Sequence, residues 1–155
     1  MSREMRRKDR AMGRDDSEKL LETALVGRLG VFDEEPYIVP VNYVYQSGKL
    51  WFHCAPEGRK LRAIERNPRV CFEVDEFLGI KKGKEACSFG AYFKSVIAFG
   101  EAQIIKDVSR KRDVLTMLLT KYGGDEEWSI CDRELEKVAV VEVTLTFVTG
   151  KCRLP

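Results

Sequence analysis

The chain has 155 residues, of which 44% are apolar and 34% are charged, so its length and composition suit one domain with a core and a well-solvated surface. A formal net charge of +2 is too close to neutral to indicate a nucleic-acid-binding protein by itself. No apolar run approaches the roughly 20 residues that span a bilayer, and no apolar stretch follows the basic start of the chain as it would in a signal peptide.

Basic residues gather near the start of the chain. They are Arg3, Arg6, Arg7, Lys8, Arg10 and Arg14. Such a run is typical of an arm that binds nucleic acid or a membrane, or of a solvated terminus that packs its charges on the rest of the protein. We favour the second interpretation and expect no nucleic-acid or membrane partner. Residues 1–155 are treated as one domain, with residues 1–15 as a basic N-terminal arm.

The first third of the chain predicts one helix and three strands. Leu20, Leu21 and Ala24 recur at helical spacing, and Asp16 or Ser17 could cap the free N–H groups at the helix start. Residues 29–32, 37–45 and 49–54 are the expected strands, with a hairpin turn at 46–48. Pro40 has no N–H to donate, so it indicates an edge, a bulge or an irregular stretch inside the second strand.

The rest of the chain predicts three helices and three strands. A helix over 57–67 is followed by a strand over 69–74, and residues 77–88 show no clean period, which indicates a loop. A strand over 93–105 contains Gly100, which predicts a bulge or a close backbone approach. Helices over 109–122 and 126–135 precede a final strand over 138–149. Six strands that follow one another mainly as hairpins predict a mainly β fold, a small antiparallel barrel with peripheral helices.

The segment from His53 to Lys60 combines a strand end, a glycine turn and a helix start. Gly58 lies in the turn, and Arg59 and Lys60 follow it directly. A helix start directs free N–H groups and a partial positive charge at one point, and guanidinium and ammonium groups bind phosphate oxygens. The pattern therefore predicts a phosphate site. The alternative is that both basic residues are ordinary surface charges.

The cysteines indicate neither a zinc site nor a disulfide framework. They stand at positions 54, 71, 87, 131 and 152, without a CxxC pair and with one histidine in the chain. Cys54 and His53 are neighbours on a strand, so their side chains face opposite sides and a catalytic dyad is not expected. Reduced thiols in a cytoplasmic protein are the simplest explanation.

Three blocks of the sequence together resemble a known family. They are Ile38 to Tyr43, Leu50 to Lys60 and Asn67 to Phe72. This pattern resembles the flavin-binding split-barrel superfamily, and more closely the pyridoxamine 5′-phosphate oxidase-like proteins of the 5-nitroimidazole resistance reductase subfamily. Residues 5–10 and 95–102 are also similar, so the resemblance extends in order over most of the chain.

The resemblance implies a six-stranded antiparallel split β-barrel that forms a homodimer, with FMN at the subunit interface. It implies that Gly58, Arg59 and Lys60 hold the FMN phosphate and that His53 lies close to the flavin ring or the substrate. It further implies cofactor contacts from Pro40, Val41, Asn42, Tyr43 and Ser95. Full pyridoxamine 5′-phosphate oxidases carry further basic residues near the C-terminus that residues 150–155 do not match, which argues against vitamin oxidation.

His53 is the residue for which we consider a catalytic role, because its unperturbed pKa lies near neutrality. It could act as a general acid toward a nitro group, hydrogen-bond the flavin and tune it, or be a satisfied histidine at a strand end. We expect an FMN-dependent oxidoreductase that takes electrons from NAD(P)H, reduces a small organic acceptor such as a 5-nitroimidazole, and uses no metal. A non-catalytic flavin or haem binding protein, a deazaflavin-dependent reductase and a nucleic-acid-associated regulator remain as alternatives.

Overall fold

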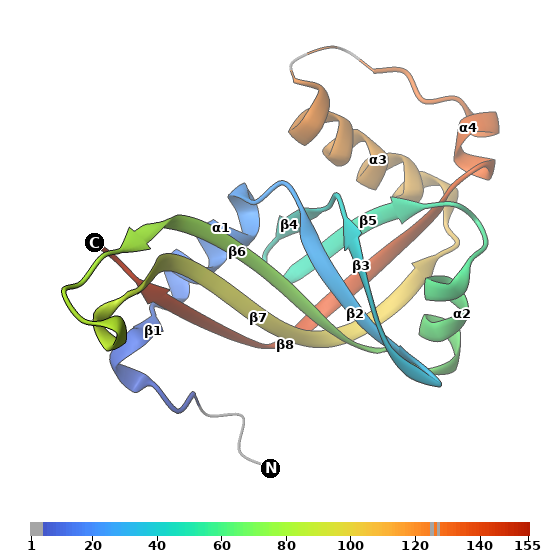
Figure 1. Ribbon diagram of the computed structural model, residues 1–155. Helices are drawn as coiled ribbons and strands as arrows, with labels where there is room; N and C mark the ends of the chain where they lie inside the picture. Colours follow the sequence, from blue (N-terminus) through green and yellow to red (C-terminus); the bar gives the residue numbers. More distant parts are fainter. Residues whose placement is uncertain (1–4, 125, 127) are drawn as a thin grey trace.

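The computed structural model describes residues 5–124, 126 and 128–155, and consists of one antiparallel sheet with helices around it (Figure 1). The strands are β1 (Ala11–Met12), β2 (Gly27–Asp33), β3 (Glu35–Val41), β4 (Val44–Gln46), β5 (Lys49–Cys54), β6 (Arg69–Lys81), β7 (Gly90–Ile105) and β8 (Ala139–Arg153). The helices are α1 (Arg14–Thr23), α2 (Arg59–Arg66), α3 (Val108–Gly123) and α4 (Asp132–Glu136), with short 3₁₀ turns η1 (Lys8–Arg10) and η2 (Ala86–Ser88). Of the predicted basic arm, Arg3 lies outside the described residues.

The sheet curves into a barrel that is left open at one seam. Its strand order is β3-β2-β6-β7-β8-β5-β4, and β1 pairs with β8. Strands β3 and β4 stand at the two ends of this order although only Asn42 and Tyr43 separate them in sequence. The predicted mainly β, antiparallel architecture is confirmed. The predicted number of six strands is wrong, because the expected strand over 37–45 breaks in two at the seam and the short β1 adds an eighth.

The hairpin and edge signals of the sequence are confirmed. Ser47 and Gly48 have positive φ angles of 50° and 81° and join β4 to β5 in a two-residue turn. Pro40 lies in the edge strand β3, where its missing N–H costs no ladder bond on the open side. The ladder between β7 and β8 shifts register between Phe99 and Gly100. A Cβ built at Gly100 would lie 2.3 Å from the Thr144 carbonyl oxygen, so the strands approach there as only glycine allows.

Two local predictions are wrong. Helix α1 begins at Arg14 with Gly13 as its N-cap, so neither Asp16 nor Ser17 caps it. Ser17 is buried inside the helix, and its hydroxyl donates to the Gly13 carbonyl oxygen at 2.7 Å. The expected loop over 77–88 is strand as far as Lys81, because β6 continues its ladder with β7 past a register shift between Phe77 and Gly79.

The interior of the barrel is the main hydrophobic core. Alternate residues of β5 and β6 point inward, so that Leu50, Phe52, Phe72 and Val74 are each fully buried. Tyr43 at the seam also points inward, and its ring meets Phe72 edge-on at 4.8 Å between centroids. The seam is therefore anchored to the core by its own aromatic side chain.

A second, smaller core lies outside the barrel, where α3 covers β4, β5 and the start of β8 (Figure 1). Its buried members are Val44, Ile105, Val114, Leu118 and Val140. The described residues contain no helix with the length and apolar character needed to cross a membrane. The short helix expected over 126–135 is α4, which begins only at Asp132; residues 125 and 127 lie outside the described part of the chain.

Candidate functional site

The backbone at the seam is held by α3. The Tyr122 hydroxyl accepts a hydrogen bond from the Tyr43 N–H at 2.9 Å, and it lies within donating distance of the carbonyl oxygens of Leu25 (2.7 Å) and Tyr43 (2.9 Å). The Asn42 side-chain amide donates to the Leu25 carbonyl at 3.1 Å. Of the predicted flavin contacts at the seam, Tyr43 thus has its backbone N–H engaged by Tyr122, whereas Asn42 is exposed and keeps its side-chain oxygen available.

His53 lies beside Asn42 at the end of β5. Leu50 and Phe52 point into the barrel, so His53 points outward, toward the face that carries α3. Burial lowers the pKa of the His53 imidazole, and the nearby positive charge of Lys60 lowers it further. The imidazole is therefore neutral at pH 7. It makes no hydrogen bond to any residue in the described part of the chain, so a ligand could use either ring nitrogen.

Cys54 does not share this environment. Its side chain packs against the barrel core, on the opposite side of β5 from His53. Burial raises the pKa of the Cys54 thiol, which disfavours the reactive thiolate. A Cys/His dyad is therefore absent at this pair of residues, as expected from the strand alternation.

A cavity of about 510 Å³ opens in front of His53 and Asn42. Its walls come from α3 and from the segment that follows it. They are Leu115, Leu118, Leu119, Tyr122, Trp128, Ser129, Ile130, Glu134 and Val138. Arg112 on α3 fixes the far wall by donating to the Ile130 carbonyl and pairing with Asp132. A volume in this range is typical of small-molecule sites, which are mostly apolar with a few polar groups.

The N-terminus of α2 lies a few residues beyond His53. Gly58 is its N-cap, with a φ of 147° that favours glycine, and no side chain caps the free N–H groups that follow. Lys60 extends over the Phe52 ring, with its Nζ atom 5.8 Å from the ring centroid. Uncapped N–H groups beside an ammonium group suit an anion such as a phosphate.

Arg59 points elsewhere. Its guanidinium pairs with Asp33 at 3.0 Å and with Glu35 at 2.8 Å, and it stacks on the Tyr37 ring at 4.4 Å. Arg66 approaches the same Asp33 carboxylate at 2.6 Å. Lys60 therefore stands at the start of α2 with its ammonium over the Phe52 ring, whereas Arg59 belongs to an ion-pair cluster that ties α2 to the β2–β3 turn.

Ser95 is far from His53 within one chain. It pairs with Lys151 on β8, whereas His53 pairs with Val140 on the same strand. Eleven residues of strand separate these two positions, which corresponds to on the order of 30 Å. The Ser95 hydroxyl lies 3.5 Å from the Lys151 carbonyl oxygen. Ser95 and His53 can therefore meet at one ligand only if they come from different copies of the chain.

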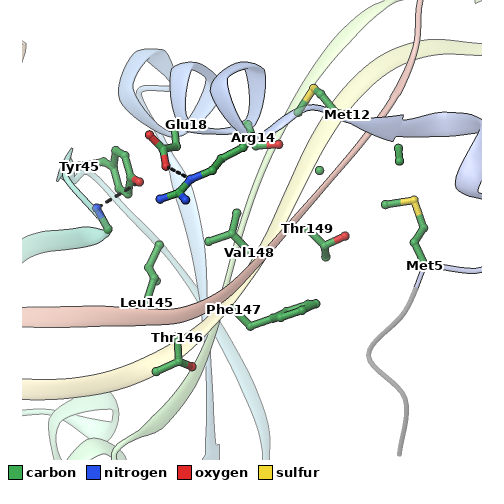
Figure 2. Close-up of a pocket in the computed structure, with 14 residues that line it drawn as sticks. Met5, Met12, Arg14, Glu18, Tyr45, Leu145, Thr146, Phe147, Val148 and Thr149 are labelled. Atoms are coloured by element: carbon green, nitrogen blue, oxygen red, sulfur yellow. Dashed lines mark hydrogen bonds and ion pairs between the residues drawn. The ribbon is translucent and has the colours of Figure 1, made fainter.

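A second cavity, of about 590 Å³, lies between α1, the start of the chain and β8 (Figure 2). Figure 2 shows Arg14 and Glu18 paired at its rim, with 2.8 Å between their charged atoms, above Leu145, Phe147 and Val148. Of the described residues that line it, none is among the predicted site residues. The cavity beside α1 is thus separate from the one at the histidine and the seam.

Several site residues are absent from the sequence prediction. Tyr122, Trp128 and Glu134 come from segments that the sequence predicts only as helices, and their neighbours at the seam are far away in sequence. The sequence predicts the end of this helix at residue 122, but nothing in it indicates that the helix end reaches the seam. Asp33 is also absent from the prediction, because its pairing with Arg59 spans 26 positions of sequence.

Known proteins share the sequence pattern and the fold described above. The sequence model of a family described as pyridoxamine 5′-phosphate oxidase matches residues 13–152. An uncharacterized protein of Rhizobium meliloti (strain 1021) is 29% identical over 84 residues, which are 54% of this chain and 55% of that protein, so the chain spans about half the length of this curated relative.

Two solved structures are similar over most of their length. A candidate 5-nitroimidazole antibiotic resistance protein from Bacteroides thetaiotaomicron VPI-5482 is 28% identical, with a TM-score of 0.79, over 91% of this chain and 85% of that chain. An FAD-binding protein from Mesorhizobium loti is 25% identical, with a TM-score of 0.68, over 91% of this chain and 95% of that chain.

Proposed function

Because this chain belongs to the pyridoxamine 5′-phosphate oxidase family, we propose that it is an oxidoreductase that binds FMN and reduces a small organic acceptor. The observation that carries the proposal is the juxtaposition of an uncapped, lysine-flanked helix N-terminus with a neutral histidine at the mouth of a mostly apolar cavity. The similarity to an FAD-binding protein supports a flavin as the cofactor.

The residues present fit a flavin nucleotide. The N–H groups at the start of α2 and the Lys60 ammonium would hold the phosphate, because they are the uncompensated positive groups beside the open space at Gly58. Arg59 would contribute only by leaving the carboxylates of Asp33 and Glu35. When bound, FMN would supply the electron-transfer chemistry, and the protein supplies binding and orientation.

His53 and Asn42 would define the polar edge of the site. The neutral imidazole carries one N–H donor and one acceptor nitrogen, and the free Asn42 oxygen is an acceptor. In this position His53 would orient a bound molecule and donate a hydrogen bond to it, or pass it a proton. The Tyr122 hydroxyl keeps the seam backbone fixed so that these two side chains keep their spacing.

The proposal includes a homodimer with the flavin at the subunit interface. Directly opposed residues on the outer face of five adjacent strands form an apolar row, which is Ile38, Gly30, Cys71, Phe99 and Phe147. Ile38 is 68% exposed and its neighbour Phe32 is 54% exposed, which is unusual for a face without a partner. In such a dimer, Ser95 of one copy and His53 of the other could contribute to the same flavin site, because the two residues are far apart within one chain.

The electron donor and the location are part of the same proposal. We take NAD(P)H as the donor and the cytoplasm as the location. In support of a reducing compartment, all five cysteines are free thiols in the described residues. The similarity to a candidate 5-nitroimidazole resistance protein makes a 5-nitroimidazole the first acceptor to assay.

A spectrum of the purified protein tests the proposal. We expect the visible absorption of an oxidised flavin, and we expect denaturation to release FMN, identified by its mass. Anaerobic NAD(P)H should bleach the spectrum, and an added acceptor should restore it. A colourless protein that takes up no FMN, a haem spectrum or a released deazaflavin would contradict the cofactor assignment. Flavin that no nicotinamide nucleotide reduces would indicate a carrier instead of an enzyme.

A further inference from the structure

The cavity in front of His53 has an unbalanced charge. Its lining contains no lysine or arginine among the described residues, and Glu134 is the one member that carries a full charge at neutral pH. His53 is neutral there, as argued above, and the ammonium groups of Lys60 and Lys121 are outside the lining. Among the lining residues, an anionic ligand would therefore meet a carboxylate and no cation, because Lys137, whose charge acts on Glu134, lies outside the lining.

The Glu134 carboxylate is fixed in place. Glu134 lies in the first turn of α4, and its Oε2 atom accepts a hydrogen bond from the Cys131 N–H at 2.9 Å. This backbone hydrogen bond lowers the pKa of the Glu134 carboxyl, so the group stays ionised at neutral pH. The α4 segment is in turn held to α3 by Lys111, which donates to the Leu135 carbonyl oxygen.

The remaining walls suit an aromatic ring. Leu115, Leu119 and Tyr122 on α3 form one side, and Trp128 stands at the lip with 47% of its surface exposed. The Trp128 indole reaches the end of α3 because residue 123 is glycine: a Cβ there would lie 3.1 Å from the ring. Aromatic and aliphatic side chains of this kind bind ring systems through apolar contact and stacking.

We propose that this cavity binds an uncharged aromatic molecule and that Glu134 excludes anionic analogues of the same shape. Asn42 and His53 would bind a single polar group at the inner edge of that molecule. Phosphorylated and carboxylated compounds are thereby poor ligands, and neutral nitro-substituted or carbonyl-substituted rings are good ones. The identification of this ligand as the electron acceptor rests on the proposed function, whereas the charge selectivity of binding does not.

The test uses two probes that differ in charge and hardly in shape, 4-nitrobenzamide and 4-nitrobenzoate. Binding to the purified full-length protein is measured by equilibrium dialysis at low ionic strength. We expect the amide to bind roughly tenfold or more tightly than the carboxylate, which is the scale of one like-charge contact near a protein surface. Equal affinities would overturn the proposal.

Glu134→Gln isolates the charge, because the glutamine oxygen can still accept the Cys131 N–H. The variant should narrow the ratio of the two affinities toward one, by improving nitrobenzoate binding. Glu136→Gln is the matched control, since Glu136 lies on the same helix but outside the cavity lining, and should leave the ratio unchanged. An unchanged ratio in a folded Glu134→Gln protein would also overturn the proposal.

A salt titration and a measurement of flavin binding complete the test. Should Glu134→Gln not fold, raising the salt concentration with the wild-type protein replaces it, because screening should narrow the affinity ratio and a constant ratio would contradict the charge mechanism. A protein that prefers the amide but binds no flavin would refute the proposed function and support the cavity assignment. A protein that binds flavin but does not prefer the amide would support the proposed function and refute the cavity assignment.

Discussion

Replacing Tyr122 with phenylalanine should lower the free energy of unfolding by about 2 kcal/mol, because it leaves the buried Tyr43 N–H without an acceptor and removes one hydrogen bond to a carbonyl. An unsatisfied buried donor costs about 1–3 kcal/mol, and the lost donor bond about 0.5–1.5 kcal/mol. Because the Leu25 carbonyl belongs to an exposed residue and can bond to water instead, the lost donor bond adds little, and about 2 kcal/mol is the middle of the range for the buried donor alone.

Urea denaturation followed by circular dichroism measures this change, and the thermal midpoint should fall by roughly 4–8 °C for a chain of this size. Tyr92→Phe is the matched control, since the Tyr92 hydroxyl makes no hydrogen bond to a described residue, and its effect should stay within about 0.5 kcal/mol. A Tyr122→Phe protein as stable as the wild type would show that the hydroxyl does not hold the seam.

Two more predictions concern the barrel itself. Gly27→Ala should destabilise the protein by about 1–3 kcal/mol or more, because the new Cβ would lie 2.0 Å from the buried Phe72 ring. Gly30→Ala is the control and should be close to neutral, because its new Cβ would meet no atom closer than 3.5 Å. Equal thermal midpoints for the two variants would contradict the packing. Burial alone would raise the pKa of Glu142, but hydrogen bonds from Lys49 and Trp51 and the charge of Arg110 outweigh it and lower that pKa below 4.5. Ionised Glu142 therefore stabilises the fold above about pH 4.5, and this stabilisation is lost as the pH falls through its folded-state pKa. The Glu142→Gln protein should be less stable than the wild type at pH 7 and should lose less stability on acidification. Urea midpoints that change in parallel with pH in the two proteins would contradict this.

The elements that the sequence predicts well are those decided by neighbouring residues. Strand 49–54 is found at those bounds, and the Ser47-Gly48 turn and the Gly100 bulge are found where glycine chemistry requires them. Pro40 lies on an edge strand for the reason that its missing N–H implies. Such features depend on a few adjacent dihedral angles, so a single sequence is enough to predict them.

The features that the sequence does not predict depend on distant partners. Strand β6 extends to Lys81 because β7 offers it a continuous ladder, which compensates for the irregular pattern after Phe77. Ser17 looks like a helix cap until the close approach of Gly150 shows that α1 packs there on β8. In each case the tertiary contact, and not the local propensity, decides the structure.

At the site, too, features set by neighbouring residues are predictable and features set by distant partners are not. The residues around His53 and Gly58 could be predicted, because a strand end, a glycine turn and a helix start are contiguous in the chain. The different roles of Arg59 and Lys60 could not, since Asp33 and Glu35 reach Arg59 only through the fold. The cavity walls on α3 and α4 could not be predicted either, because they are far in sequence from Asn42 and His53.

The most direct test of the phosphate site compares FMN with riboflavin, which lacks the phosphate, in the wild type and in Lys60→Ala. Isothermal titration should show that Lys60→Ala weakens FMN binding by about 1.5–3 kcal/mol and leaves riboflavin binding unchanged, with Arg62→Ala, an exposed position on the same helix, as the neutral control. If Lys60→Ala leaves FMN affinity intact, or weakens FMN and riboflavin equally, the start of α2 does not hold the phosphate.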